Sequence, residues 1–220
     1  AGVLTMIQAR HARWAQLIFD PYIRRLMKKH FQRFILVNEL PTLNGPLVLT
    51  PNHFSWWDGF LIYRVYRDAF PDKKFYIMML EHQLRRYHFF GKLGAYSIDQ
   101  QNPVSMRDTI HYTRSILKGN SAVIIYPQGA ITRYDQRPPD LKEGLRLFLP
   151  DASADVPVVP VAFKVLYGEH QKPDLLFRSG AQLPSGVVKK NFEQYAAAFT
   201  ENLNQLDAIE INQVKGRNLL

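Results

Sequence analysis

PNHFSWWDG, residues 51–59, follows the apolar run Pro46 to Thr50 and leads into a segment with helical periodicity, Trp56 to Arg67. This order places His53 at the carboxyl end of a strand, the edge at which open α/β sheets hold their sites. Asp58 comes five positions after His53, and five helical steps turn through about 140°, so the two side chains meet only if the backbone turns between them. An imidazole oriented by a carboxylate can take a proton from a hydroxyl, and the pair therefore predicts a general base.

On both sides of this stretch the sequence predicts an α/β fold. After Pro41, β-rich runs alternate with helical segments, which is typical of a mixed sheet wrapped by helices. The expected strands are Pro46 to Thr50, Phe75 to Met79, Ala95 to Ile98, Ala122 to Tyr126, Val156 to Val165 and Leu175 to Arg178. The expected helices are Trp56 to Arg67, Pro103 to Leu117, Leu141 to Leu149, and a long final one from Phe192 towards Val214.

The 220 residues contain no internal repeat and no linker long enough to separate domains. Pro138-Pro139 and the segment Asp151 to Asp155 indicate surface loops. We expect residues 41–220 to form one α/β domain, and residues 1–40 to belong to the same structural unit.

Residues 1–40 have the pattern of two amphipathic helices. Asp20 resembles an N-cap, and Pro21 is suited to the first position of a second helix. The apolar stripe consists of Val3, Ile7, Trp14 and Ile18, then Ile23, Met27, Phe31 and Phe34. The basic residues are Arg10, Arg13, Arg24, Arg25, Lys28, Lys29 and Arg33, against Asp20 alone. This composition is typical of helices that lie on a membrane surface, but it equally fits helices packed on the domain with a solvated basic face.

The overall composition narrows the class of protein. Lys and Arg number 28 against 19 acidic residues, and the net charge of +9 favours anionic partners such as phospholipid surfaces, nucleotides or nucleic acid. The absence of cysteine excludes disulfides, thiolate zinc sites and an acyl-carrying thiol. No run approaches the roughly 18 consecutive apolar residues of a spanning helix, and the first residues lack the apolar core of a signal peptide.

Motifs of other enzyme classes are missing. The chain has no Gly-x-Ser-x-Gly elbow of a serine hydrolase, no His-Glu-x-x-His pattern and no Gly-x-x-x-x-Gly-Lys phosphate loop. We therefore expect no metal site and no nucleotide hydrolysis.

Three further blocks follow the His53 stretch in order: Gly91 to Asp99, Ile124 to Gly129, and Val156 to Val161. With them, the chain from about Leu47 to Phe163 resembles the glycerolipid acyltransferase family, which includes glycerol-phosphate and lysophosphatidic acid acyltransferases. The matching positions are Asn52, His53, Ser55 and Asp58 in the first block, Gly94 and Ile98 in the second, and Pro157 and Pro160 in the fourth; the third block, with the residues directly after it, reads Tyr126-Pro127-Gln128-Gly129-Ala130-Ile131-Thr132.

The third block departs from the family pattern. Its usual form is Phe-Pro-Glu-Gly-Thr-Arg-Ser, but Gln128 replaces the glutamate, Ile131 replaces the arginine, and the next arginine is Arg133. The arginine that commonly closes the second block is Gln100. In the family these positions bind the acceptor, and the arginines bind its phosphate. Because isoleucine removes a bidentate phosphate ligand, we expect phosphate-bearing acceptors to be held less well.

The resemblance implies transfer of a fatty acyl group from acyl-CoA or acyl carrier protein to a hydroxyl of a lipid acceptor, with no other cofactor. His53 would be the general base and Asp58 would orient it. The expected substrate-binding residues are Asn52, Ser55, Gly94, Tyr126, Pro127, Gln128, Gly129, Arg133 and Lys142, the last within a Lys-x-Gly sequence common in the family.

The acceptor is open between a lysophospholipid and a phosphate-free or sugar-bearing lipid. The expected location is peripheral, on an anionic membrane surface at the cytoplasmic face, without a nucleic-acid partner. The alternative is a non-catalytic basic protein that binds membrane surfaces or nucleic acid and carries a decayed acyltransferase site. Consumption of a thioester that depends on His53 would exclude this alternative.

Overall fold

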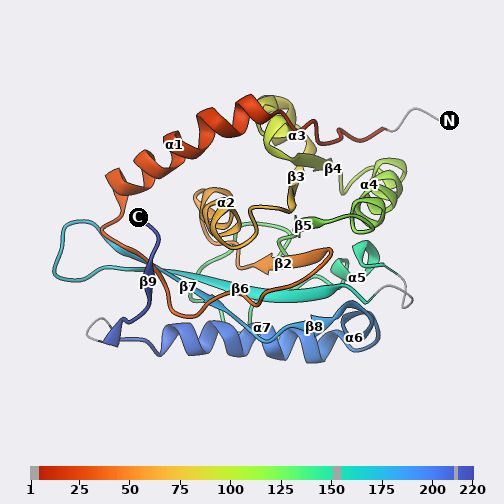
Figure 1. The fold of residues 1–220 in the computed structure, drawn as a ribbon. Coiled ribbons are helices and arrows are strands. Elements are labelled where there is room, and N and C mark those ends of the chain that lie inside the picture. Colours follow the sequence, from red (N-terminus) through yellow and green to blue (C-terminus); the bar gives the residue numbers. More distant parts are fainter. Residues whose placement is uncertain (1–4, 151–154, 211–212) are drawn as a thin grey trace.

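The computed structural model describes residues 5–150, 155–210 and 213–220. In this part of the chain a nine-stranded mixed sheet has the order β4-β3-β5-β2-β6-β7-β1-β9, and β8 pairs with β6 (Figure 1). The strands are β1 Phe34–Leu36, β2 Leu47–Pro51, β3 Lys74–Leu80, β4 Ala95–Ile98, β5 Ser121–Ile124, β6 Pro157–Leu166, β7 Asp174–Ser179, β8 Leu183–Pro184 and β9 Arg217–Asn218. The strands from β4 to β6 in this order are parallel, whereas β7 runs antiparallel to β6.

Helices cover both faces of the sheet (Figure 1). They are α1 Arg13–His30, α2 Asp58–Ala69, α3 Glu81–Arg86, the 3-10 helix η1 His88–Leu93, α4 Pro103–Ile116, α5 Leu145–Phe148, α6 Ser185–Lys190 and α7 Phe192–Asp207. Alternate residues of β2 divide the core, because successive side chains of a strand point to opposite faces. Leu47 and Leu49 pack in one cluster with α1 and α2, while Val48 packs in the other with α7.

Most of the expected α/β elements are confirmed. All six expected strands are present, and β4 has the expected bounds. The helix expected over Leu141 to Leu149 is shorter, since α5 comprises Leu145–Phe148 alone, and the final helix ends at Asp207 rather than near Val214. Residues 151–154 of the expected Asp151 loop lie outside the described residues.

The prediction of two N-terminal helices is wrong, because α1 is one helix that continues through Pro21. Its buried stripe, Ala15, Phe19, Ile23 and Met27, keeps a four-residue spacing across the proline. Pro21 and Leu17, whose carbonyl loses its helical donor, are both exposed, so water can satisfy that carbonyl while the stripe stays buried.

The segments next to α1 also differ from the prediction. Before the helix, the backbone N–H groups of Arg10 and Ala12 donate to Gly91 and Lys92 of η1. After it, Phe34 begins β1 and lies in register with Leu175 of β7 instead of extending the helix. Val3, expected in the first apolar stripe, lies outside the described residues. None of the helices in the described ranges combines the length and the apolar composition that a bilayer span requires.

Candidate active site

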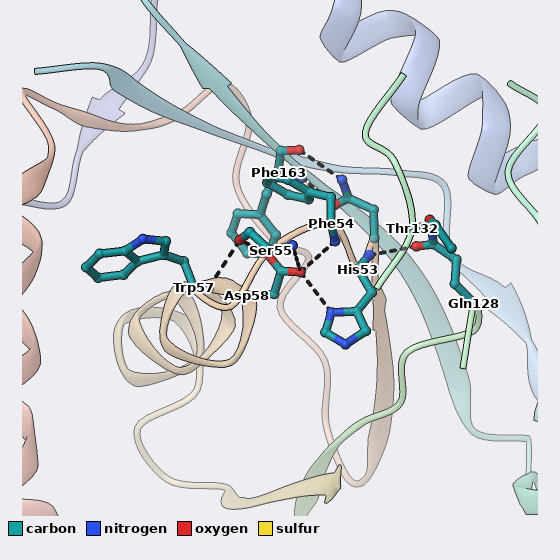
Figure 2. A network of polar contacts seen from close by, with 9 residues as sticks. His53, Phe54, Ser55, Trp57, Asp58, Gln128, Thr132 and Phe163 are labelled. Atoms are coloured by element: carbon teal, nitrogen blue, oxygen red, sulfur yellow. Dashed lines mark hydrogen bonds and ion pairs between the residues drawn. The ribbon is translucent and has the colours of Figure 1, made fainter. Parts of the chain in front are cut away.

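A tight turn between β2 and α2 brings His53 and Asp58 together. β2 ends at Pro51, α2 begins at Asp58, and the N–H of Asp58 donates back to the carbonyl of Ser55 at 3.4 Å. The ring Nδ1 of His53 then lies 2.8 Å from Oδ2 of Asp58 (Figure 2). The turn that the sequence required for this contact is therefore present.

The Asp58 carboxylate is fully buried but surrounded by donors. Besides the His53 ring, Oδ2 accepts from the backbone N–H groups of Phe54 at 2.7 Å and Ser55 at 2.9 Å. The Ser55 hydroxyl donates to Oδ1 at 2.6 Å. Asp58 also occupies the first turn of α2, where the helix dipole favours an anion. These contacts replace the hydration that burial removes and fix the carboxylate in one orientation.

The contact with Asp58 defines the chemistry of the His53 ring. Since an ionised carboxylate only accepts hydrogen bonds, Nδ1 carries the proton and Nε2 has the free lone pair of a base. No described residue forms a hydrogen bond with Nε2, and 23% of the side chain is exposed. The ring of Tyr126 stacks on the imidazole with centroids 4.2 Å apart and planes inclined by 26°. The imidazole is thus held on one edge and one face.

The third sequence block holds the backbone of His53. β5 pairs with β2, and the turn that follows it from Tyr126 to Gly129, closed by a 3.1 Å hydrogen bond, uses a positive φ of 71° at Gly129. Gln128 Oε1 accepts from the His53 N–H at 2.6 Å, and Gln128 Nε2 donates to the hydroxyl of Thr132. The N–H of Thr132 donates to the His53 carbonyl at 3.0 Å. Sequence reasoning did not select Thr132 as a site residue, although it lies only four residues after Gln128.

Asn52 and Ser55 lie next to the pair but are engaged by the protein itself. The buried Asn52 amide donates to the carbonyl of Phe163 at 3.0 Å and accepts from the Phe163 N–H at 2.8 Å. Ser55 uses its hydroxyl proton on Asp58 and accepts from the N–H of Trp57 at 3.1 Å (Figure 2). Asn52 therefore ties the His53 loop to β6, and Ser55 braces both Asp58 and the start of α2.

With this geometry established, comparison with known proteins identifies the family. A family model described as "Acyltransferase" matches residues 22–164. The chain belongs to the acyltransferase family. The membership of an acyltransferase family that the ordered blocks indicate is thereby confirmed.

Among solved structures, this acyltransferase-family chain is similar to the 1-acyl-sn-glycerophosphate (LPA) acyltransferase PlsC from Thermotoga maritima. The TM-score is 0.62 at 13% sequence identity, and the alignment covers 88% of this chain and 80% of that chain. The likeness shows that the two proteins share the α/β fold. No curated protein sequence matches the chain.

Gly94, a family position of the second block, lies away from the His53–Asp58 pair. Ala95, the residue after Gly94, is in register with Ile77 of β3, which is in register with Ile124 and so with Leu49 of β2. Gly94 is therefore well short of the carboxyl edge that carries His53. Its φ is 119°, and a Cβ there would lie 2.1 Å from the carbonyl oxygen of Phe75, so the position requires glycine for packing.

The two cations expected near the acceptor are paired with neighbouring acids. Arg133 forms a 2.7 Å ion pair with Asp135, and 82% of its side chain is exposed. Lys142 Nζ lies 2.6 Å from Asp140, while its backbone N–H donates to the carbonyl of Pro127 at 2.8 Å. Neither cation contacts His53 or Asp58 in the described residues.

Gly129 is close to both Lys142 and Gln100. A Cβ on Gly129 would lie 3.6 Å from Lys142 Cγ and 3.8 Å from Gln100 Nε2. The position at which the family commonly has its second-block arginine is thus beside the third block, where this chain has a neutral amide.

Tyr126 has a hydroxyl that is buried and has no hydrogen-bond partner among the described residues. Burial, and to a smaller extent the negative charge of Asp58, raises the pKa of Tyr126 well above its ordinary value. The phenol therefore remains neutral beside the imidazole.

Proposed function

We propose that this protein is an O-acyltransferase that moves a fatty acyl group from a thioester donor, acyl-CoA or acyl carrier protein, to a hydroxyl of a lipid acceptor. The observation that carries the proposal is the His53–Asp58 contact of 2.8 Å, which leaves Nε2 of a partly exposed imidazole available as a base. Membership of the acyltransferase family supports the reaction type.

In the proposed reaction, His53 Nε2 removes the proton of the acceptor hydroxyl as its oxygen attacks the thioester carbonyl. A C–O bond forms and the C–S bond breaks, and the imidazolium then protonates the departing thiolate. Asp58 stabilises the imidazolium through Nδ1–H. Ser55 is not assigned as a nucleophile, because its hydroxyl donates to Asp58 rather than to His53.

For the acceptor, we propose a lipid whose head group is phosphate-free, such as a sugar-bearing lipid. Ile131 is 55% exposed in the loop that carries the third block, and Gln100 lies beside Gly129, so neither family arginine position supplies a cation. Arg133 and Lys142 are already paired with acids, and a phosphate would have to compete with those carboxylates. The named substrate of the PlsC relative, lysophosphatidic acid, is the contrasting acceptor.

We propose that α1 contacts an anionic membrane surface, at the cytoplasmic face, as a peripheral anchor. Its outer face exposes Trp14, Leu17, Ile18 and Tyr22, between 50% and 75% of each residue. Arg13, Arg24, Arg25, Lys28 and Lys29 on the same helix are also exposed. Exposed aromatic and aliphatic side chains flanked by basic residues are suited to the boundary between acyl chains and head groups.

α1 also packs against the loop between β2 and α2 that carries His53. The ring of Trp57, the residue before Asp58, lies 5.2 Å from the ring centroids of both His30 and Phe31 at the carboxyl end of α1. A membrane held by α1 would therefore lie near the start of α2 and the His53 loop, where a lipid acceptor is needed.

The test is release of free thiol from long-chain acyl-CoA and acyl carrier protein, with lipid acceptors presented on anionic vesicles. We expect release by the wild type and loss of release in His53→Ala. His82→Ala is the matched control, because His82 is an exposed histidine on α3. Release that survives His53→Ala, or wild type that binds vesicles without consuming either donor, would overturn the proposal.

A further inference from the structure

Both backbone polar groups of His53 are bound by the third sequence block and the residues directly after it. Its N–H donates to Gln128 Oε1 at 2.6 Å, and its carbonyl accepts from the Thr132 N–H at 3.0 Å. The side chains of Gln128 and Thr132 are joined by their own hydrogen bond, which closes a ring of contacts around one residue (Figure 2). Buried backbone groups need partners, and here a side chain 75 positions away supplies one of them.

Gln128 has little capacity left for a substrate. The residue is 6% exposed, Oε1 is bound to His53, and Nε2 is bound to Thr132. An acceptor-binding side chain would present a polar atom to the open part of the site, as Nε2 of His53 does. Gln128 is instead hydrogen-bonded to the His53 backbone, where its side chain can hold the base in place.

The neutrality of Gln128 affects the charge around the base. The titratable groups in contact with His53 are Asp58 from α2 and Tyr126 after β5. Tyr126 is neutral, so Asp58 provides the one negative charge in direct contact with the imidazole among the described residues. A glutamate at position 128 could accept the same His53 N–H, but it would add a second buried carboxylate in contact with the backbone of His53.

We propose that Gln128 is a positioning residue that fixes the backbone of His53 without adding charge, and that it does not bind the acceptor. This inference rests on the proposed function, in which His53 is the base. Displacing a catalytic group by about 1 Å can reduce the rate about 10²-fold, so the constraint has a measurable effect on turnover.

The kinetic test compares Gln128→Ala and Gln128→Glu with the wild type. We expect Gln128→Ala to lower kcat about 10²-fold while the KM for the acceptor changes less than about twofold. Gln128→Glu should keep most of its activity at alkaline pH, but the acid limb of its pH–rate profile should move to higher pH. The sign follows because a nearby carboxylate favours the protonated imidazole, which cannot act as a base.

Gln136→Glu is the matched control for charge, since Gln136 is exposed in the loop that follows Thr132. It should leave the pH profile unchanged. Thr132→Val should lower kcat, because it removes the hydroxyl that accepts from Gln128. Thr132→Ser should retain the wild-type kcat, because it keeps that hydroxyl. A raised acceptor KM with unchanged kcat in Gln128→Ala would overturn the inference in favour of acceptor binding.

A second readout does not depend on turnover. By NMR, the backbone amide of His53 should exchange slowly in the wild type and at least about tenfold faster in Gln128→Ala, while an amide in the β5–β2 ladder stays protected. The His53 ring should titrate at higher pH in Gln128→Glu than in the wild type. If the wild type lacks thioester consumption, the proposed function fails, and the exchange and titration still decide the role of Gln128. Unchanged exchange in Gln128→Ala would overturn that role in a folded, active enzyme.

Discussion

Oδ2 of Asp58 binds the ring of His53 at 2.8 Å and also accepts from the backbone N–H groups of Phe54 and Ser55. One buried carboxylate therefore holds both the imidazole and the turn that carries it. This double use explains how a histidine and an aspartate separated by four residues can act together although they could not share one face of a helix.

Asp58→Asn should lower kcat about 10⁴-fold, because the amide can donate to Nδ1 and stabilise the wrong tautomer of His53. The substitution also turns an amide N–H₂ or a weaker acceptor towards the N–H groups of the turn, so thermal unfolding should be measured alongside thiol release. Asp140→Asn, at an exposed acid paired with Lys142, is the control and should retain activity. Near-normal turnover in Asp58→Asn would contradict the assigned role.

Asn52→Ala should lower the free energy of unfolding by about 2–4 kcal/mol, because it leaves the buried N–H and carbonyl of Phe163 without partners. Urea unfolding checks this, with Asn204→Ala on the exposed face of α7 as control. Unchanged stability combined with a raised substrate KM would instead favour the substrate-binding role that the sequence predicted.

Gly94→Ala should destabilise the fold by about 2–4 kcal/mol, because φ is 119° and the added Cβ would meet the Phe75 carbonyl. Gly144→Ala is the matched control, since its φ is −52° and nothing lies within 4 Å of an added Cβ. Thermal or urea unfolding of the two variants gives the comparison. Equal stability of both would show that the close approach at Gly94 is not a constraint.

Ile131→Arg combined with Gln100→Arg should raise the ratio of kcat/KM for lysophosphatidic acid over a phosphate-free acceptor about tenfold, because both positions gain a donor that binds phosphate. The control for net charge is Tyr167→Arg combined with Gln194→Arg, which adds the same two positive charges at a residue 74% exposed beyond β6 and at an exposed residue of α7. The comparison uses the same vesicles and donor throughout. An equal rise in the control would attribute the effect to net charge rather than to the acceptor site.

Leu17→Glu with Ile18→Glu should weaken binding to anionic vesicles at least about tenfold and reduce turnover of vesicle-bound acceptor, because it places two charges on the exposed apolar face of α1. Turnover of an acceptor dispersed in detergent should change little. Gln194→Glu with Asn204→Glu puts the same charge on the exposed face of α7, across the sheet from α1 (Figure 1). Vesicle cosedimentation that is equal for both double variants would contradict membrane docking through α1.

The local pattern of apolar residues and turn signals was sufficient to predict most strands of the sheet. Strands such as β2 and β4 are short apolar runs between turn signals, and their bounds follow from the sequence within one or two residues. The prediction that Pro21 begins a second helix was wrong. Proline is favoured at the first position of a helix and disfavoured in its interior, but the buried stripe that contains Phe19 and Ile23 continues through Pro21 in α1. β1 and β9 could not be foreseen, since their pairing joins opposite ends of the chain.

The α/β class, the family and the His53–Asp58 pair could all be predicted from the amino-acid sequence, because they depend on periodicity, ordered blocks and residues close together in the chain. The groups that surround the His53 base, in contrast, depend on how the strands assemble into the sheet. The contacts of His53 with Gln128 and of Asn52 with Phe163 join residues 75 and 111 positions apart, and they exist because β5 and β6 both pair with β2. A sequence pattern selects residue types, whereas partners so distant are set by strand order and register, through the packing of the whole sheet.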